Sequence, residues 1–100
     1  MSIAKAIKKA RQNVSLVSFG NQWQVNTYSE SHRAWWQGNP TTYAQARRWA
    51  SEAIVQFALE KLGYLGEDAY DLSVTLPCGT IRDRIKWALE KYPPTKEEMP

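Results

Sequence analysis

The sequence contains one cysteine, one histidine and no long apolar run, and each scarcity excludes a class of protein. A single Cys78 cannot close a disulfide within the chain, and one cysteine with one histidine does not supply a zinc site. No stretch approaches the roughly 20 apolar residues that cross a bilayer, so no membrane contact is expected. The first 12 residues interleave isoleucine and alanine with four basic side chains, unlike a signal peptide. The predicted location is the cytoplasm.

Side chains that carry out catalysis are also scarce. The only histidine, His32, offers a base to Cys78, and this pair is the one nucleophilic arrangement that can be written for the sequence. Single thiols are more often packing residues. Glu67, Asp68 and Asp71 follow no metal-binding spacing and fit an acidic turn in solvent, and the five glycines are scattered rather than gathered in a phosphate-binding loop. We therefore expect a protein that is not an enzyme and that uses no cofactor or metal.

The length of 100 residues suits a single domain with its own hydrophobic core. The apolar patterns predict one α+β domain over residues 1–92. Pro93-Pro94 ends the last helical pattern, and the polar residues that follow predict a flexible tail over 93–100.

The first third of the sequence predicts a helix followed by three antiparallel strands. Ser2 is a suitable cap for an N-terminal helix whose isoleucines and alanines share one face. Two runs of strand composition, Val14–Phe19 and Gln22–Tyr28, are joined by Gly20-Asn21, a pair typical of a tight hairpin turn. A third strand is expected over His32–Gln37.

A long helix that packs against this sheet is predicted over Thr42–Leu62. Its first residue and Gln45 match a capping box, and Gly63 stands where a left-handed C-terminal cap is expected. Apolar residues keep the helical period for more than four turns. Trp49 and Phe57 are expected to supply most of the area buried between this helix and the sheet.

The pattern after the long helix is mixed. In the loop that we expect there, Leu72, Val74 and Leu76 alternate, which is compatible with a short strand. A C-terminal helix is predicted after Thr80, which can cap it, and its apolar face extends to Tyr92.

Charge is distributed unevenly along the chain. Residues 1–50 carry a net charge of +6, whereas residues 51–100 carry −3. If the basic segments pack together, they form one surface for an acidic partner such as nucleic acid; the plainer interpretation is solvated helix faces. The residues of this candidate basic surface are Lys5, Lys8, Lys9, Arg47 and Arg48.

Five tryptophans are many for 100 residues, and they suggest a recognition surface. Trp35 and Trp36 are neighbours on a strand, so one of them should leave the helix-covered face, beside Arg33. Trp87 is expected to share the polar face of the last helix with Arg84. These five residues form the candidate partner-binding surface. In the alternative, Trp35 packs under the N-terminal helix and Trp87 under the segment that follows the long helix.

The order of one helix, three strands and a long helix over residues 2–62 is similar to that of the double-stranded RNA-binding domain. Ala50, Ala53, Ala58 and Leu59 echo that family's small-residue packing, and the resemblance implies nucleic-acid binding. The sequence departs from the family in its two-residue loop Gly20-Asn21 and in the arginines of the long helix, which come one turn after its start.

The size and build also resemble the small inhibitors encoded by phages and mobile elements, anti-CRISPR proteins among them. This resemblance carries no motif and transfers no residue roles. It implies a protein that blocks a host defence complex, such as a multisubunit nucleoprotein, by occupying its surface. A non-catalytic inhibitor of this kind is our first hypothesis, and a nucleic-acid-binding domain is the second.

Overall fold

The computed structural model describes residues 1–29, 34–75 and 79–94, and it describes residues 29 and 34–37 by their backbone alone. In the described residues one helix is followed by three consecutive strands and then by three helices, so the predicted α+β class is confirmed. Residues 95–100 lie outside the described residues, and the flexible tail stays a prediction. The elements are α1 (Ile3–Arg11), β1 (Val14–Phe19), β2 (Gln22–Ser29), β3 (Ala34–Gln37), α2 (Tyr43–Lys61), α3 (Gly66–Thr75) and α4 (Ile81–Lys91).

The strands form an antiparallel sheet in the order β1-β2-β3. Gly20 adopts a φ of 64° in the turn between β1 and β2, as the hairpin prediction requires. The register sets Leu16 opposite Val25, and Val25 is fully buried under α2. Val17 and Phe19 alternate with the inward residues of β1 and are 39% and 60% exposed. One face of the sheet is therefore covered by helix, and these two side chains belong to the other face.

The start of α2 is tied directly to β2. Trp23 and Thr41 exchange two backbone hydrogen bonds, of 2.8 and 2.9 Å. The Thr42 hydroxyl caps α2 by accepting a hydrogen bond from the Gln45 amide at 3.2 Å, as predicted. The ring of Trp23 stands edge-on to that of Tyr43, with 5.0 Å between their centroids. These contacts fix the angle at which α2 leaves the sheet.

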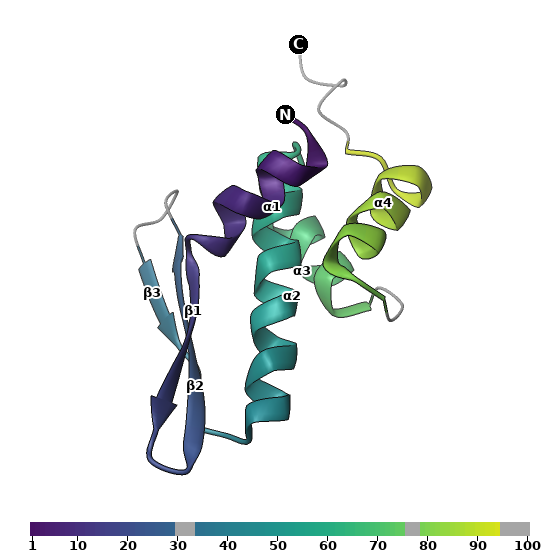
Figure 1. Ribbon diagram of the computed structural model, residues 1–100. Helices are drawn as coiled ribbons and strands as arrows, with labels where there is room; N and C mark the ends of the chain where they lie inside the picture. The colour runs from purple at the N-terminus through teal and green to yellow at the C-terminus, as the bar shows by residue number, and fades with distance from the viewer. Residues whose placement is uncertain (30–33, 76–78, 95–100) are drawn as a thin grey trace.

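The helix α2 runs through the middle of the molecule (Figure 1). The sheet lies on one side of it, whereas α3 and α4 lie on the other, and α1 crosses beside its second half. With 19 residues, α2 is about 28 Å long at 1.5 Å per residue. Gly63 ends it with a φ of 110°, in agreement with the predicted cap.

The hydrophobic core differs from the predicted one. Trp49 and Phe57 are only half-buried, and the cluster between sheet and helix centres on Val25, Ala46 and Ala50. The larger cluster lies among the four helices, and its fully buried members are Ala6, Ala10, Val55, Ala58, Leu59, Ala69, Ile85 and Ala88. The prediction was wrong because it assigned all of α2 to the sheet, whereas the second half of α2 packs against other helices.

The strand suggested for residues 72–76 is also wrong, because residues 66–75 form α3. Ala69 donates a backbone hydrogen bond to the Leu65 carbonyl at 2.8 Å, and Ala69 and Ser73 are buried at helical spacing. The acidic side chains in the first turn favour a helix, since they oppose its dipole. In a strand, Leu72 and Val74 would share a face; here Leu72 is half-buried and Val74 is 43% exposed.

None of the helices in the described segments is both long and apolar enough to cross a membrane.

Replacing Leu59 by alanine tests the helical core. Leu59 is fully buried in the larger cluster, so the substitution leaves a cavity and should lower the free energy of unfolding by about 2–5 kcal/mol in urea denaturation. Val74→Ala, at an exposed position, serves as the control and should change stability by less than about 0.5 kcal/mol. Equal effects of the two substitutions would contradict this core.

Candidate functional site

Part of the predicted partner-binding surface, Trp35 and Trp36, belongs to β3. The register pairs Trp36 with Thr27 and Trp35 with Tyr28. Thr27 is buried at 7% exposure. Arg33 lies outside the described residues, as do the side chains of Trp35 and Trp36, so their exposure stays a prediction.

Trp87 and Arg84 lie on α4, where the expectation of an exposed tryptophan is wrong. Both side chains are half-buried. The chain turns sharply after α4 at Tyr92, with φ −137° and ψ 69°, and this turn sets the Tyr92 ring 5.7 Å from that of Trp87. Helical periodicity could not anticipate this cover, because it comes from a residue beyond the helix. The buried Nε of Arg84 makes no hydrogen bond within the part of the chain that the structure describes.

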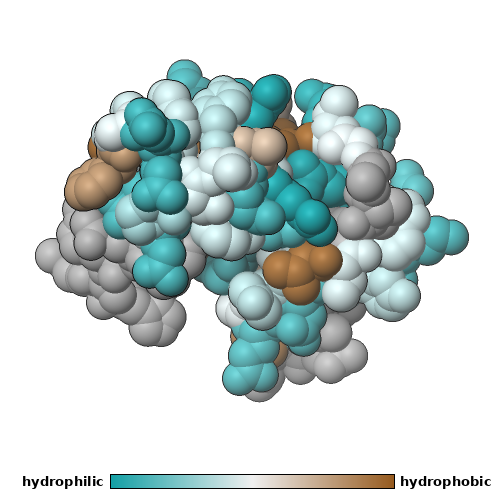
Figure 2. Space-filling view, turned by 90° about the horizontal axis from the view of Figure 1, so that it is seen from below, coloured by the Kyte–Doolittle hydropathy of each residue, from teal (hydrophilic) through white to brown (hydrophobic). Residues whose placement is uncertain are grey.

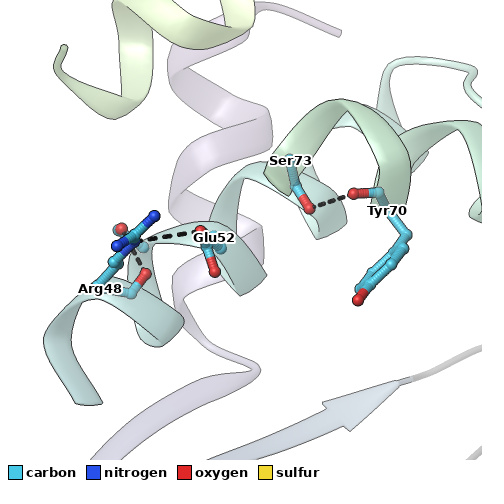
Figure 3. Close-up of polar contacts among 5 residues, drawn as sticks. Arg48, Glu52, Tyr70 and Ser73 are labelled. Atoms are coloured by element: carbon cyan, nitrogen blue, oxygen red, sulfur yellow. Dashed lines mark hydrogen bonds and ion pairs between the residues drawn. The ribbon is translucent and has the colours of Figure 1, made fainter. Parts of the chain in front are cut away.

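The residues of the candidate basic surface lie on two different helices. Lys5, Lys8 and Lys9 are exposed on α1, whose buried Ala6 and Ala10 pack against the second half of α2. Arg47 and Arg48 are exposed near the start of α2, and about 10 Å of helix separates Arg48 from Val55, the first buried α2 residue of the cluster that contains Ala6 and Ala10. Arg48 also pairs with Glu52 at 3.7 Å (Figure 3).

The basic charge of α1 adjoins α4 instead. The two helices contact each other, and Ile3 and Ile7 of α1 belong to the same hydrophobic cluster as Ile85 of α4. Four basic residues and no acidic ones belong to α1, and α4 has four basic and two acidic residues. The α1 and α4 pair is therefore the most basic part of the described chain.

A groove opens between α3 and the end of α4, and its volume is about 400 Å³. This is within the usual range for sites that hold a small ligand or a side chain. The residues that line it are Tyr64, Leu65, Asp68, Asp71, Leu72, Tyr92, Pro93 and Pro94.

Three faces of α3 have different environments, and one of them forms a wall of this groove. Ala69 and Ser73 face the core, where the Ser73 hydroxyl donates a 2.7 Å hydrogen bond to the Tyr70 carbonyl of its own helix (Figure 3). Tyr70 is 55% exposed, and its ring points away from this contact. Asp68 and Asp71 are exposed along the groove, three residues apart and therefore on the same side of the helix.

The other side of the groove is aromatic. Tyr92 is 57% exposed, but its ring packs against that of Trp87, with 5.7 Å between the ring centroids, and is supported by this contact. Tyr64 is 7% exposed and contributes a mostly covered surface at the base of α3. The groove thus combines a supported aromatic ring, prolines and two carboxylates.

Apolar side chains are also exposed at the opposite end of the molecule, where α2 begins: Val17, Phe19 and Tyr43 are 39%, 60% and 48% exposed. Seen from that end, the surface is largely hydrophilic, and its apolar residues form small separate patches (Figure 2).

The described residues contain no group of three or more histidine, cysteine, aspartate or glutamate side chains that could hold a metal ion. The His32 and Cys78 pair considered as a catalytic arrangement lies outside the described residues.

Comparison with known proteins finds no matching family model, no matching curated protein and no matching solved structure.

Sequence reasoning missed the groove, because residues 63–79 were interpreted as a loop. The sequence did contain a signal. Leu65, Asp68 and Leu72 are three and four residues apart, and Asp71 follows Asp68 by three, so in a helix all four lie along one side. The second wall depends on the turn at Tyr92, and the helical periodicity of the sequence does not predict a turn beyond the end of the helix.

Replacing Tyr64 by phenylalanine should stabilise the protein. The Tyr64 hydroxyl is buried and has no hydrogen-bond partner among the described residues, so its removal should raise the free energy of unfolding at pH 7 by about 1 kcal/mol in urea denaturation. Tyr70→Phe is the matched control and should have little effect.

The same substitution should alter the response to alkali. Burial raises the pKa of Tyr64 above its ordinary value, because it disfavours the charged phenolate in the folded state. The wild type should therefore lose stability as the pH rises through about 10 towards the folded-state pKa, and Tyr64→Phe should lose less over this interval. An equal loss in both proteins would contradict this assignment.

Proposed function

We propose that this chain is a non-catalytic binding protein that acts on a protein partner in the cytoplasm, in the manner of the small phage and mobile-element inhibitors. The observation that carries the proposal is the supported but exposed ring of Tyr92 at the edge of the groove. Aromatic side chains held in place on a surface lose little conformational freedom on binding, and they dominate the energetics of protein interfaces.

Exposed apolar residues on α3 and just before it add to this surface. Leu65, Tyr70 and Val74 are 57%, 55% and 43% exposed. Single exposed apolar side chains are ordinary, but three large ones within ten residues, beside a groove, favour an interface with a macromolecule over a site for a small molecule alone.

The proposed partner is a subunit of a multisubunit nucleoprotein complex of host defence, which would make the chain anti-CRISPR-like. Subunits that hold nucleic acid expose lysine and arginine. The charge of α3, whose acidic residues Glu67, Asp68 and Asp71 have no basic neighbour within the helix, is complementary to such a surface. Occupation of that surface would block the complex without any chemical step.

A photo-crosslinking amino acid at position 92 tests this proposal in cells of the organism that encodes the chain. We expect one dominant crosslinked protein, identified as a subunit of a defence complex, because Tyr92 lies in the proposed interface. The control carries the crosslinker at Tyr43, which is 48% exposed at the far end of α2. Crosslinking that is absent at position 92, or the same from both positions, would count against the proposal.

Nucleic-acid binding is the second candidate, and the packing of α1 on α4 favours it. The basic side chains of α1 are exposed without an acidic residue in the helix, and they adjoin a second net-basic helix. Such a surface suits a phosphate backbone.

Salt dependence distinguishes this candidate from the first. If α1 contacts phosphates, the affinity for a DNA or RNA duplex in a mobility-shift assay should fall steeply with salt. In a plot of the logarithm of the association constant against the logarithm of the salt concentration, each lost contact should reduce the steepness of the slope by about 0.9. The triple variant K5Q/K8Q/K9Q should therefore show a shallower slope, whereas R47Q/R48Q, in the separate basic group, should not. No shift at low salt would eliminate nucleic-acid binding.

A further inference from the structure

We propose that the groove between α3 and residues 92–94 binds a lysine or arginine side chain that the protein partner presents among apolar residues. The inference rests on the proposed function, and it names the chemistry that the groove selects. It is carried by the placement of two uncommitted carboxylates opposite a supported aromatic ring.

The carboxylates of Asp68 and Asp71 are available to a ligand. Neither makes an ion pair or a side-chain hydrogen bond within the described residues. The helix dipole accounts for Asp68, which stands in the first turn of α3, but Asp71 lies beyond that turn. Packing does not account for Asp71 either, because its side chain is exposed. A cation between the two carboxylates would be bound by both.

The rest of the lining suits the stem of a long basic side chain. Lysine and arginine combine an apolar stem with a charged end, and they place each part in the matching environment. Leu72, Pro93 and Pro94 offer apolar surface to the stem. The face of an exposed tyrosine attracts a cation, and Trp87 holds Tyr92 in place for that contact. A neutral apolar ligand would leave both carboxylates in contact with its apolar surface, which is unfavourable.

Two other occupants are less compatible with the charge of the groove. The segment that follows Pro94 in the chain contains Lys96 but also Glu97 and Glu98, so its net charge is negative. A second copy could present the basic residues of α1, but the large apolar side chains of that helix, Ile3 and Ile7, are half-buried against their own core and do not accompany the exposed lysines. We therefore assign the groove to a different protein.

The experiment measures binding of a short peptide by chemical-shift perturbation of the full-length chain labelled with ¹⁵N. The probe is acetyl-Leu-Arg-Leu-Leu-amide, and its partner probe has glutamine in place of arginine. We expect the arginine peptide to shift the amides of residues 64–72 and 92 and to bind about fivefold more tightly than the glutamine peptide. Shifts confined to other residues, or equal affinity for the two peptides, would overturn the inference.

Variants of α3 separate a specific site from general attraction between charges. The double variant D68N/D71N keeps the shape of the groove and should weaken binding of the arginine peptide about fivefold. Glu67→Gln removes a charge from the same helix turn but outside the groove lining, and it should leave the affinity unchanged. Equal weakening by both would show that charge alone attracts the peptide, and it would also overturn the inference.

The remaining outcomes identify the other occupants. Tighter peptide binding by Lys96→Gln would show that the chain's own C-terminal segment occupies the groove. Shifts of the same residues on concentrating the chain without peptide would identify a second copy. If crosslinking from position 92 to a partner is unchanged in D68N/D71N, or if the wild type crosslinks the partner but does not bind the arginine peptide, the inference fails and the proposed function stands. Loss of all crosslinking in the wild type removes both.

Discussion

The arrangement of this fold depends on the close packing of α2 against the sheet and the other helices. Buried alanines permit this close packing because their side chains are small. Alanines at positions 46 and 50 face the sheet, and others at 6, 10, 58 and 88 are fully buried between helices. The largest fully buried side chains are only Leu59, Ile85, Val25 and Val55. Contacts built on such small groups leave little room for aromatic rings in the interior. Several aromatic side chains consequently lie at the surface, where Tyr43, Tyr70 and Tyr92 are about half exposed.

Charge is sorted along the same layers. The helix that carries four basic residues, α1, and the helix that carries three acidic ones, α3, both pack on α2 through apolar faces. Each presents a charge of one sign to its surroundings, and neither neutralises the other through an ion pair in the described segments. The result is a small domain with an acidic, aromatic groove and a separate basic surface. These two surfaces suit different ligands, and they motivate the two functional proposals.

The sequence predicted the features that local chemistry decides. The caps at Ser2, Thr42 and Thr80 each accept the expected amide hydrogen bond, and the turn at Gly20 has the left-handed backbone that the hairpin needs. The long helix and its end at Gly63 follow from the same rules. These elements could be predicted because each depends on residues within one turn of one another.

The features that depend on distant contacts were not predicted. Residues 72–76 alternate like a strand, but burial of Ala69 and Ser73 against α2 decides for a helix. The two basic groups carry the same charge but lie in different places. The lysines are on α1, which packs on the second half of α2, whereas Arg47 lies near the start of α2. The groove was missed for the same reason: one wall required α3 to be a helix, and the other required Tyr92 to turn back over Trp87.

The backbone at Tyr92 links this groove to the end of α4. The Tyr92 amide donates the last hydrogen bond of the helix, to the Ala88 carbonyl at 2.8 Å, and the ring of the same residue forms part of the groove wall. Fraying of the final turn would therefore remove the wall, and a ligand seated against the ring would oppose fraying. Occupancy and local unfolding are then coupled equilibria, so amide hydrogen exchange in the last turn of α4 should slow in proportion to the fraction of groove that is filled.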